Sequence, residues 1–189
     1  MDMRSLANYA VMLFPCTEVA LLVFRRSRES SSAKQDRSSL LVLWLTIGTS
    51  VGLAIWLQWH PAAVFPWPAS MTAAIALCIL VGGMVVRWVA ILSLGRMFTV
   101  DVAIQADHVL VQKGLYKFVR HPSYSGLLLE FAGLAVYFGT WVSMIVIVVP
   151  VTCAMLYRIR WEEVALRKTF GAQYAEYAAH TKSLIPGVV

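Results

Sequence analysis

The sequence predicts an all-α, multi-pass integral membrane protein, and its composition carries that prediction. Of its 189 residues, 59% are hydrophobic and only 14% are charged, and the mean hydropathy is +0.70. Soluble domains average about 45–50% apolar and about 25% charged residues. A chain of this size cannot hide so large an apolar excess in a core, because much of a small domain stays in contact with solvent. A bilayer is therefore the expected solvent, and a disordered or collagen-like chain is excluded.

Five transmembrane helices are expected. The first three apolar runs of spanning length are residues 6–24, 39–59 and 70–94. Each is close to or longer than the roughly 20 residues that a helix needs to cross about 30 Å of hydrocarbon. The first run is expected to stay in the mature protein, since no basic cluster precedes it and no small-residue cleavage site follows it. Residues 122–157 are too long for one span, and the turn-like residues 138–141 predict a helical hairpin there.

The distribution of Lys and Arg sets the expected orientation. Five of them lie between the first two spans and none between the second and third. The others gather mainly in residues 95–121 and in the tail after Tyr157. By the positive-inside rule, the N-terminus is outside and the C-terminus cytoplasmic. The net charge of +6 then reflects the membrane topology and also favours contact with anionic lipids. No nucleic-acid partner is expected. The compartment would be the plasma (inner) membrane of a prokaryote or the endoplasmic reticulum of a eukaryote.

The organisation expected is three N-terminal transmembrane helices in residues 1–94 and a C-terminal region in residues 95–189. The C-terminal region comprises a cytoplasmic loop, the hairpin and a cytoplasmic tail with short helices. No metal site is expected, because the three cysteines form no ligand spacing and no even-numbered framework. Oligomeric state is left open.

The two cytoplasmic stretches, residues 95–125 and 158–186, flank the hairpin. Because a hairpin returns the chain to the face it left, Tyr124 and Arg158 are expected to be neighbours. Pro122 keeps His121 out of helical geometry and starts a helix. The N–H groups of that helix terminus are suited to binding a carboxylate.

The second stretch combines charge pairs with a short terminal helix. Arg158 and Glu162 are four residues apart and share a helical face, as do Glu163 and Arg167. Gly171 is expected to end this helix, and residues 173–180 to form another. Taken singly, such features are also typical of solvated ion pairs and of interface anchors.

The combination of motifs is more specific. The strings GLYKFVRHPSYSG, RIRWEEVALRKTFGAQYAEY and LIP follow one another with the hairpin between the first two. Over residues 95–187 this pattern resembles the isoprenylcysteine carboxyl methyltransferase (ICMT) family. Phospholipid N-methyltransferases and small-thiol S-methyltransferases of the wider membrane methyltransferase superfamily look similar around RHPxY.

The resemblance implies a membrane-embedded enzyme that uses S-adenosylmethionine and lacks a soluble Rossmann-like domain. It implies catalytic roles for Arg158 and Glu162, with Arg158 facing the acceptor substrate and Arg160 as the alternative. By the same resemblance, the cofactor-binding residues are His108, Val109, Leu110, Val111, Tyr116, His121, Pro122, Ser123, Tyr124 and Glu162.

The residue chemistry is compatible with these roles. Methyl transfer chiefly demands in-line positioning of the two reactants. A carboxylate acceptor is already ionised and needs no base, and Arg158 offers it a two-donor fork. An amine or thiol must lose a proton to a base such as Glu162, Glu163 or a histidine. The preferred reaction is carboxyl O-methylation of a prenylated cysteine, in a peptide or small molecule, or of a similar lipophilic carboxylate. Phospholipid N-methylation, small-thiol S-methylation and a non-catalytic membrane scaffold or binding protein remain alternatives.

Three charged residues lie inside the expected spans. Glu18, Arg87 and Glu130 are each seven to nine residues from the cytoplasmic end of a span, which at 1.5 Å per residue is on the order of 10 Å deep. Charges at that depth usually face a partner or a cavity. Arg87 is expected to pair with Glu130 or Glu18 and to line the entry route of a lipid-like acceptor; a purely structural ion pair is the alternative.

Overall fold

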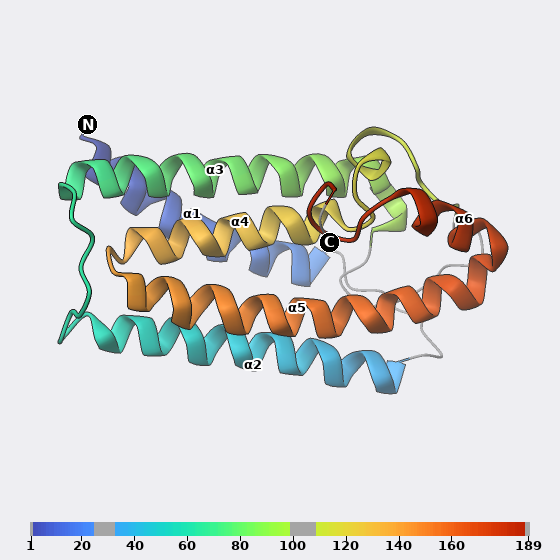
Figure 1. The fold of residues 1–189 in the computed structure, drawn as a ribbon, viewed down its shortest axis with the longest axis horizontal. Helices are drawn as coiled ribbons and strands as arrows, with labels where there is room; N and C mark the ends of the chain where they lie inside the picture. Colours follow the sequence, from blue (N-terminus) through green and yellow to red (C-terminus); the bar gives the residue numbers. More distant parts are fainter. Residues whose placement is uncertain (1, 25–32, 99–108, 188–189) are drawn as a thin grey trace.

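The computed structural model describes residues 2–24, 33–98 and 109–187, and these form a helical bundle (Figure 1). Its helices are α1 (Met3–Phe24), α2 (Ala33–Leu57), α3 (Ala69–Leu94), α4 (Pro122–Tyr137), α5 (Trp141–Phe170) and α6 (Ala172–His180), with 3₁₀ turns η1 (Gly95–Met97) and η2 (Gly114–Lys117). The described part contains isolated bridges but no strand. The all-α prediction is confirmed.

Three of the described helices are long and apolar enough to cross a membrane: Ser38–Leu57 within α2, Ala69–Leu94 and Trp141–Phe170. Helix α4 has 16 residues, which rise about 24 Å. Many large apolar side chains on the bundle surface are exposed, among them Leu45, Val85 and Ile145. These surfaces match a hydrocarbon solvent and agree with the membrane character predicted from composition.

Helices α3 and α4 pack closely through glycines. A Cβ atom at Gly126 would lie 2.5 Å from the backbone nitrogen of Arg87, and one at Gly133 would lie 2.7 Å from that of Leu80. Gly83 approaches the backbone of α4 in the same way, at 2.7 Å. Small residues at these positions let the two backbones come together, as is common between membrane helices.

Helices α4 and α5 run antiparallel and are joined by residues 138–140 (Figure 1). Gly139 has a φ of +76°, which favours glycine, and the Thr140 hydroxyl caps α5 by accepting from the Ser143 N–H at 3.0 Å. On its other side α5 packs along α2, while α1 packs against α3. Helix α5 continues past the apolar part of its sequence to Phe170, where Gly171 ends it as predicted.

The turns joining α2 to α3 and α4 to α5 lie at one end of the bundle. At the opposite end lie η2, α6, the C-terminal segment and the start of α4 (Figure 1). The basic and polar motifs of the sequence therefore gather at a single end, and the candidate site is found there.

Candidate active site

The first turn of α4 forms one wall of the candidate site. His121 precedes the helix with φ −125° and ψ 58°, and Pro122 occupies its first turn, as the sequence predicted. The carbonyl of His121 accepts the backbone N–H groups of Tyr124 and Ser125 at 3.0 and 3.1 Å. The side chains of His121, Ser123 and Tyr124 all line one cavity.

Helix α5 supplies the facing wall. Arg158 is only 2% exposed, and its Nε donates to the Tyr124 hydroxyl at 2.9 Å. Its Nη1 donates to the Ser39 hydroxyl of α2 at 3.0 Å. The predicted contact between Tyr124 and Arg158 is thereby confirmed. Arg160, two residues on, is exposed and is not among the residues that line the cavity.

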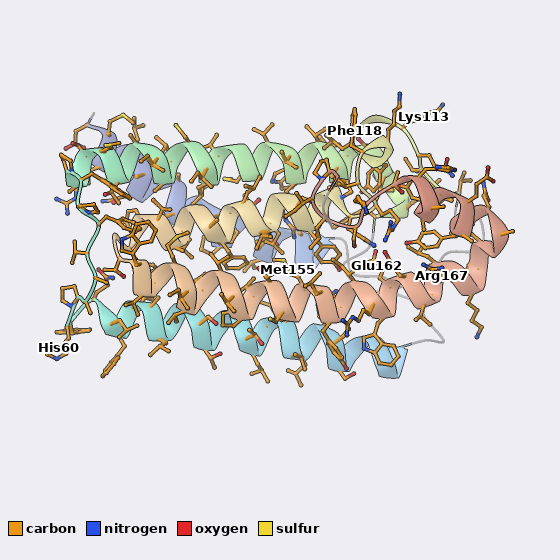
Figure 2. The ribbon with its side chains drawn as sticks, in the orientation of Figure 1. His60, Lys113, Phe118, Met155, Glu162 and Arg167 are labelled. Carbon is orange, nitrogen blue, oxygen red and sulfur yellow. The ribbon has the colours of Figure 1, made fainter. Side chains whose placement is uncertain are left out.

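Glu162 lies one turn beyond Arg158 on the same helix, at the end of the bundle where α6 and the C-terminal segment gather (Figure 2). Its Oε2 is buried and has no hydrogen-bond partner among the described residues. The His121 Nδ1 lies 3.9 Å from this oxygen. A buried carboxylate oxygen without a donor is costly, so this atom is suited to receive a cationic or N–H-bearing ligand.

Beside this wall, Arg120 and Glu163 form a second polar layer, and Arg120 itself lines the cavity. Arg120 donates from Nε and Nη2 to Glu163 Oε1 at 2.9 and 2.7 Å, and the His121 Nε2 lies 3.4 Å from the same oxygen. Arg120 also donates to the carbonyls of Ala178 and Thr181. One guanidinium thus ties the RHP sequence to both α5 and the end of α6.

The C-terminal segment completes this layer. The N–H groups of Arg120 and His121 donate to the carbonyls of Lys182 and Ser183 at 2.8 and 3.0 Å. The Ser125 hydroxyl donates to the Leu184 carbonyl at 2.6 Å. This segment satisfies backbone groups just before α4 and holds the turn that lines the cavity.

Tyrosines from η2 and α6 pack against the same layer. The Tyr177 hydroxyl donates to the Tyr116 carbonyl at 2.5 Å, and burial raises the pKa of Tyr177 to about 12. Burial and the nearby Glu162 also raise the pKa of Tyr116. Both phenols are therefore neutral near pH 7, where they can donate hydrogen bonds but do not act as bases.

The cavity itself has a volume of about 610 Å³ and extends well beyond the polar residues. Helices α1, α2 and α4 supply most of its walls, which are predominantly apolar. Along α2 it reaches from Leu40 to Ile55, a rise of about 22 Å. Its shape is a long apolar chamber with a polar head formed by Tyr124, Arg158 and Glu162.

A buried ion pair lies in the wall of this chamber. Arg87 donates from Nε and Nη2 to the two carboxylate oxygens of Glu18, each at 2.6 Å. Its Nη1 donates to the Ser123 carbonyl at 3.1 Å. Of the two partners expected for Arg87, the structure selects Glu18; Glu130 is 1% exposed and does not line the cavity.

The structure brings together most of the predicted site residues. Tyr116, His121, Ser123, Tyr124, Arg158 and Glu162 line the cavity, and Pro122 is buried beside them. Val109, Leu110 and Val111 do not line it, and Val109 is 59% exposed. His108 lies outside the described residues. Within the described ranges no group of three or more His, Cys, Asp or Glu could hold a metal ion.

Sequence reasoning missed three contributors: Ser39, Arg120 as the partner of Glu163, and the carbonyls of residues 181–184. Glu163 and Arg167 do approach to 4.0 Å, as their spacing suggested, but Arg120 is the closer partner. The position of Arg120 directly before the His121–Pro122 dipeptide was the one sequence feature that indicated a role for Arg120 in the site. This position did not indicate which acidic residue pairs with Arg120.

The fold and the site together define a helical membrane protein with an apolar chamber that ends at an Arg–Tyr–Glu head. The model of the isoprenylcysteine carboxyl methyltransferase (ICMT) family matches residues 74–168. This chain therefore belongs to the ICMT family.

Curated relatives and a solved structure agree with this assignment. Protein-S-isoprenylcysteine O-methyltransferase B of Arabidopsis thaliana is 39% identical over 114 residues, covering 59% of this chain and 58% of the relative. The Schizosaccharomyces pombe protein-S-isoprenylcysteine O-methyltransferase is 32% identical over 149 residues, covering 78% and 63%. The chain thus spans less than two thirds of these relatives. The solved structure of the eukaryotic intramembrane Ras methyltransferase ICMT shares the fold, with a TM-score of 0.55, 24% identity, and coverage of 84% of this chain and 55% of that one.

Proposed function

We propose that this protein is an S-adenosylmethionine-dependent methyltransferase that esterifies the carboxylate of a prenylated cysteine or a similar lipophilic acid. One observation carries the proposal: the buried guanidinium of Arg158 stands at the polar head of a long apolar chamber. An acceptor with a hydrocarbon chain and a terminal carboxylate matches this site, because the chain would lie in the apolar chamber and the carboxylate at Arg158. Family membership and the names of the relatives support the same reaction.

The cofactor would be held at the polar head by Tyr116, His121, Pro122, Ser123, Tyr124 and Glu162. For residues 108–111 the proposed cofactor role rests on the family resemblance alone. S-adenosylmethionine supplies the electrophilic methyl group. The unpartnered Oε2 of Glu162 suits its cationic groups, because a charge-assisted hydrogen bond is about twice as strong as a neutral one. The positive N-terminal end of the α4 dipole suits its carboxylate.

Arg158 would grip the acceptor carboxylate and align it for attack. Its anchors on Tyr124 and Ser39 hold the guanidinium between α4 and α2, so that little side-chain freedom remains to be lost on binding. The carboxylate is ionised near neutral pH. The residues therefore only have to position it and exclude water.

Phospholipid N-methylation and small-thiol S-methylation are the enzymatic alternatives, and both require a proton acceptor. Glu163 is engaged by Arg120 and His121. Among the described residues, two acidic ones line the chamber, Glu18 and Glu162, and Glu18 is engaged by Arg87, so Glu162 is the candidate base. A small thiol would leave the apolar chamber unfilled. A non-catalytic binding protein is the alternative from another class.

For the membrane, we propose five spans made by α1 to α5, with the last two as a hairpin. The proposed N-terminus is outside, and the polar end bearing α6 is cytoplasmic. Residues 95–189 carry the chemistry, while the three helices of residues 1–94 complete the chamber. The compartment would be the plasma (inner) membrane or the endoplasmic reticulum, according to the cell type.

The test is a transfer assay with methyl-labelled S-adenosylmethionine, using N-acetyl-S-farnesylcysteine, phosphatidylethanolamine and a small alkane thiol as acceptors. We expect label in the farnesylcysteine product, released by mild base as an ester is. Base-stable label in phosphatidylethanolamine or the thiol would instead establish the corresponding alternative. Folded protein that binds no S-adenosylmethionine would indicate a scaffold.

A further inference from the structure

The membrane helices contain two physically different kinds of glycine. At Gly83, Gly126 and Gly133 a Cβ atom would come within 2.7 Å of the facing backbone, so close packing accounts for these three. At Gly48 and Gly52 of α2 a Cβ atom would meet no atom within 4 Å. Packing inside the chain therefore gives no reason for a glycine at either of these positions.

Gly48 and Gly52 both line the chamber below the polar head. Trp44, Gly48, Gly52 and Ile55 recur at helical spacing and all contribute to its wall, so they share one side of α2. Ser50 and Ala54, on another side of α2, are buried, and α2 packs along α5. On the chamber-facing side, the side chains of Trp44, Ile47, Val51 and Ile55 border the two glycines. Because a Cβ atom at Gly48 or Gly52 would meet no atom within 4 Å, the two glycines leave a hollow between these side chains.

The depth of this hollow follows from Ser39. Its hydroxyl accepts from Arg158 Nη1 at 3.0 Å, so Ser39 marks the level of the guanidinium along α2. Gly48 and Gly52 come nine and thirteen residues later. At 1.5 Å per residue they lie about 14 and about 20 Å below that level.

We propose that Gly48 and Gly52 are specificity-determining residues, and that the hollow they form receives the far end of the acceptor's prenyl chain. This inference rests on the proposed function, which places the acceptor carboxylate at Arg158. An extended S-geranyl chain then ends at about the level of Gly48, whereas an S-farnesyl chain continues past it into the hollow. The missing side chains provide width for the methyl branches of an isoprenoid.

The test compares Gly48→Leu and Gly52→Leu with Gly82→Leu. Gly82 is the matched control, because a Cβ there also meets nothing within 4 Å but the residue lies on α3 outside the chamber. The acceptors are the S-geranyl, S-farnesyl and S-geranylgeranyl forms of N-acetylcysteine. We expect both α2 variants to lower the farnesyl-to-geranyl ratio of kcat/KM about tenfold or more, the scale on which apolar pockets discriminate added carbons. Gly82→Leu should retain the wild-type ratio.

Measuring the direct binding of the same three compounds separates this inference from the proposed function. If the wild type methylates none of them, the proposed function is wrong. The farnesyl-to-geranyl ratio of dissociation constants then tests whether the hollow binds the far end of the prenyl chain. Where a leucine variant does not fold, Gly48→Ala and Gly52→Ala give the same test with a smaller expected shift. The inference is overturned if folded variants retain the wild-type farnesyl-to-geranyl ratio. In that case, cross-linking would test whether the two glycines instead mediate association with a second chain.

Discussion

The Nε of Arg158 donates a hydrogen bond to the Tyr124 hydroxyl at 2.9 Å, although the two residues are 34 positions apart. The bond joins the first turn of α4 to the buried face of α5. On the proposed assignment it also joins the turn that holds the cofactor to the group that holds the acceptor. The geometry of methyl transfer would then depend in part on this contact.

Arg158→Lys should impair acceptor use far more than cofactor binding. Lysine keeps the charge but loses the planar fork and the Nε contact. We expect the acceptor kcat/KM to fall about 10- to 100-fold, the scale of lost hydrogen bonds to a charged group, with the dissociation constant of S-adenosylmethionine unchanged. Arg160→Lys is the control on the same helix, because Arg160 is exposed. Equal effects of the two substitutions would contradict the role of Arg158.

Glu162→Gln should weaken cofactor binding itself. The substitution removes the charge while preserving shape, and we expect the affinity for S-adenosylmethionine to fall about tenfold or more. Calorimetry on purified protein measures this without any acceptor. Glu176→Gln, on the exposed side of α6, should bind as the wild type does. Unchanged affinity in Glu162→Gln would remove Glu162 from the proposed cofactor site.

Tyr124→Phe should misplace the Arg158 guanidinium. A buried, charged donor loses its acceptor, and a hydrogen bond to a charged group is worth about 1.5–3 kcal/mol. We expect the acceptor kcat/KM to fall about 10- to 100-fold. Tyr137→Phe is the control, since its hydroxyl donates to Asn8 at the other end of α4. A Tyr124→Phe enzyme with wild-type kinetics would show that the 2.9 Å contact does not position Arg158.

Glu18→Ala should destabilise the protein strongly, because it leaves Arg87 buried without its counter-ion. Removing one partner of a buried ion pair typically costs about 3–5 kcal/mol. Replacing both partners with apolar residues, as in Glu18→Leu with Arg87→Met, should recover most of that loss. Denaturant unfolding in detergent measures both variants. If the double variant is no more stable than Glu18→Ala, the cost does not come from an unpaired charge.

Local features predicted the helices and their ends. The apolar runs predicted the helices, Pro122 the start of α4, and Gly171, with a φ of +52°, the end of α5. The contact between Tyr124 and Arg158 was also predictable, because the two residues lie on the two helices of a single hairpin. Each of these predictions depends on residues that are near in sequence or related by a single hairpin.

Partners from separate segments were harder to predict. Arg87 had two acidic candidates at similar depth, and the packing of α1 against α3 selected Glu18. Glu163 had a partner at helical spacing, yet Arg120 from the preceding loop lies closer. The contribution of Ser39 required α2 to lie beside α5.

The sequence by itself determined the bilayer as solvent, the helices with their start and stop signals, and the motifs that place this chain in its family. Only the tertiary structure decided which charges pair, that Arg158 and not Arg160 faces the chamber, and that Gly48 and Gly52 leave a hollow in its wall. The physical reason is that composition and periodicity act along one helix. A cavity, in contrast, is the space left between helices, and its shape depends on the angle and register at which they pack.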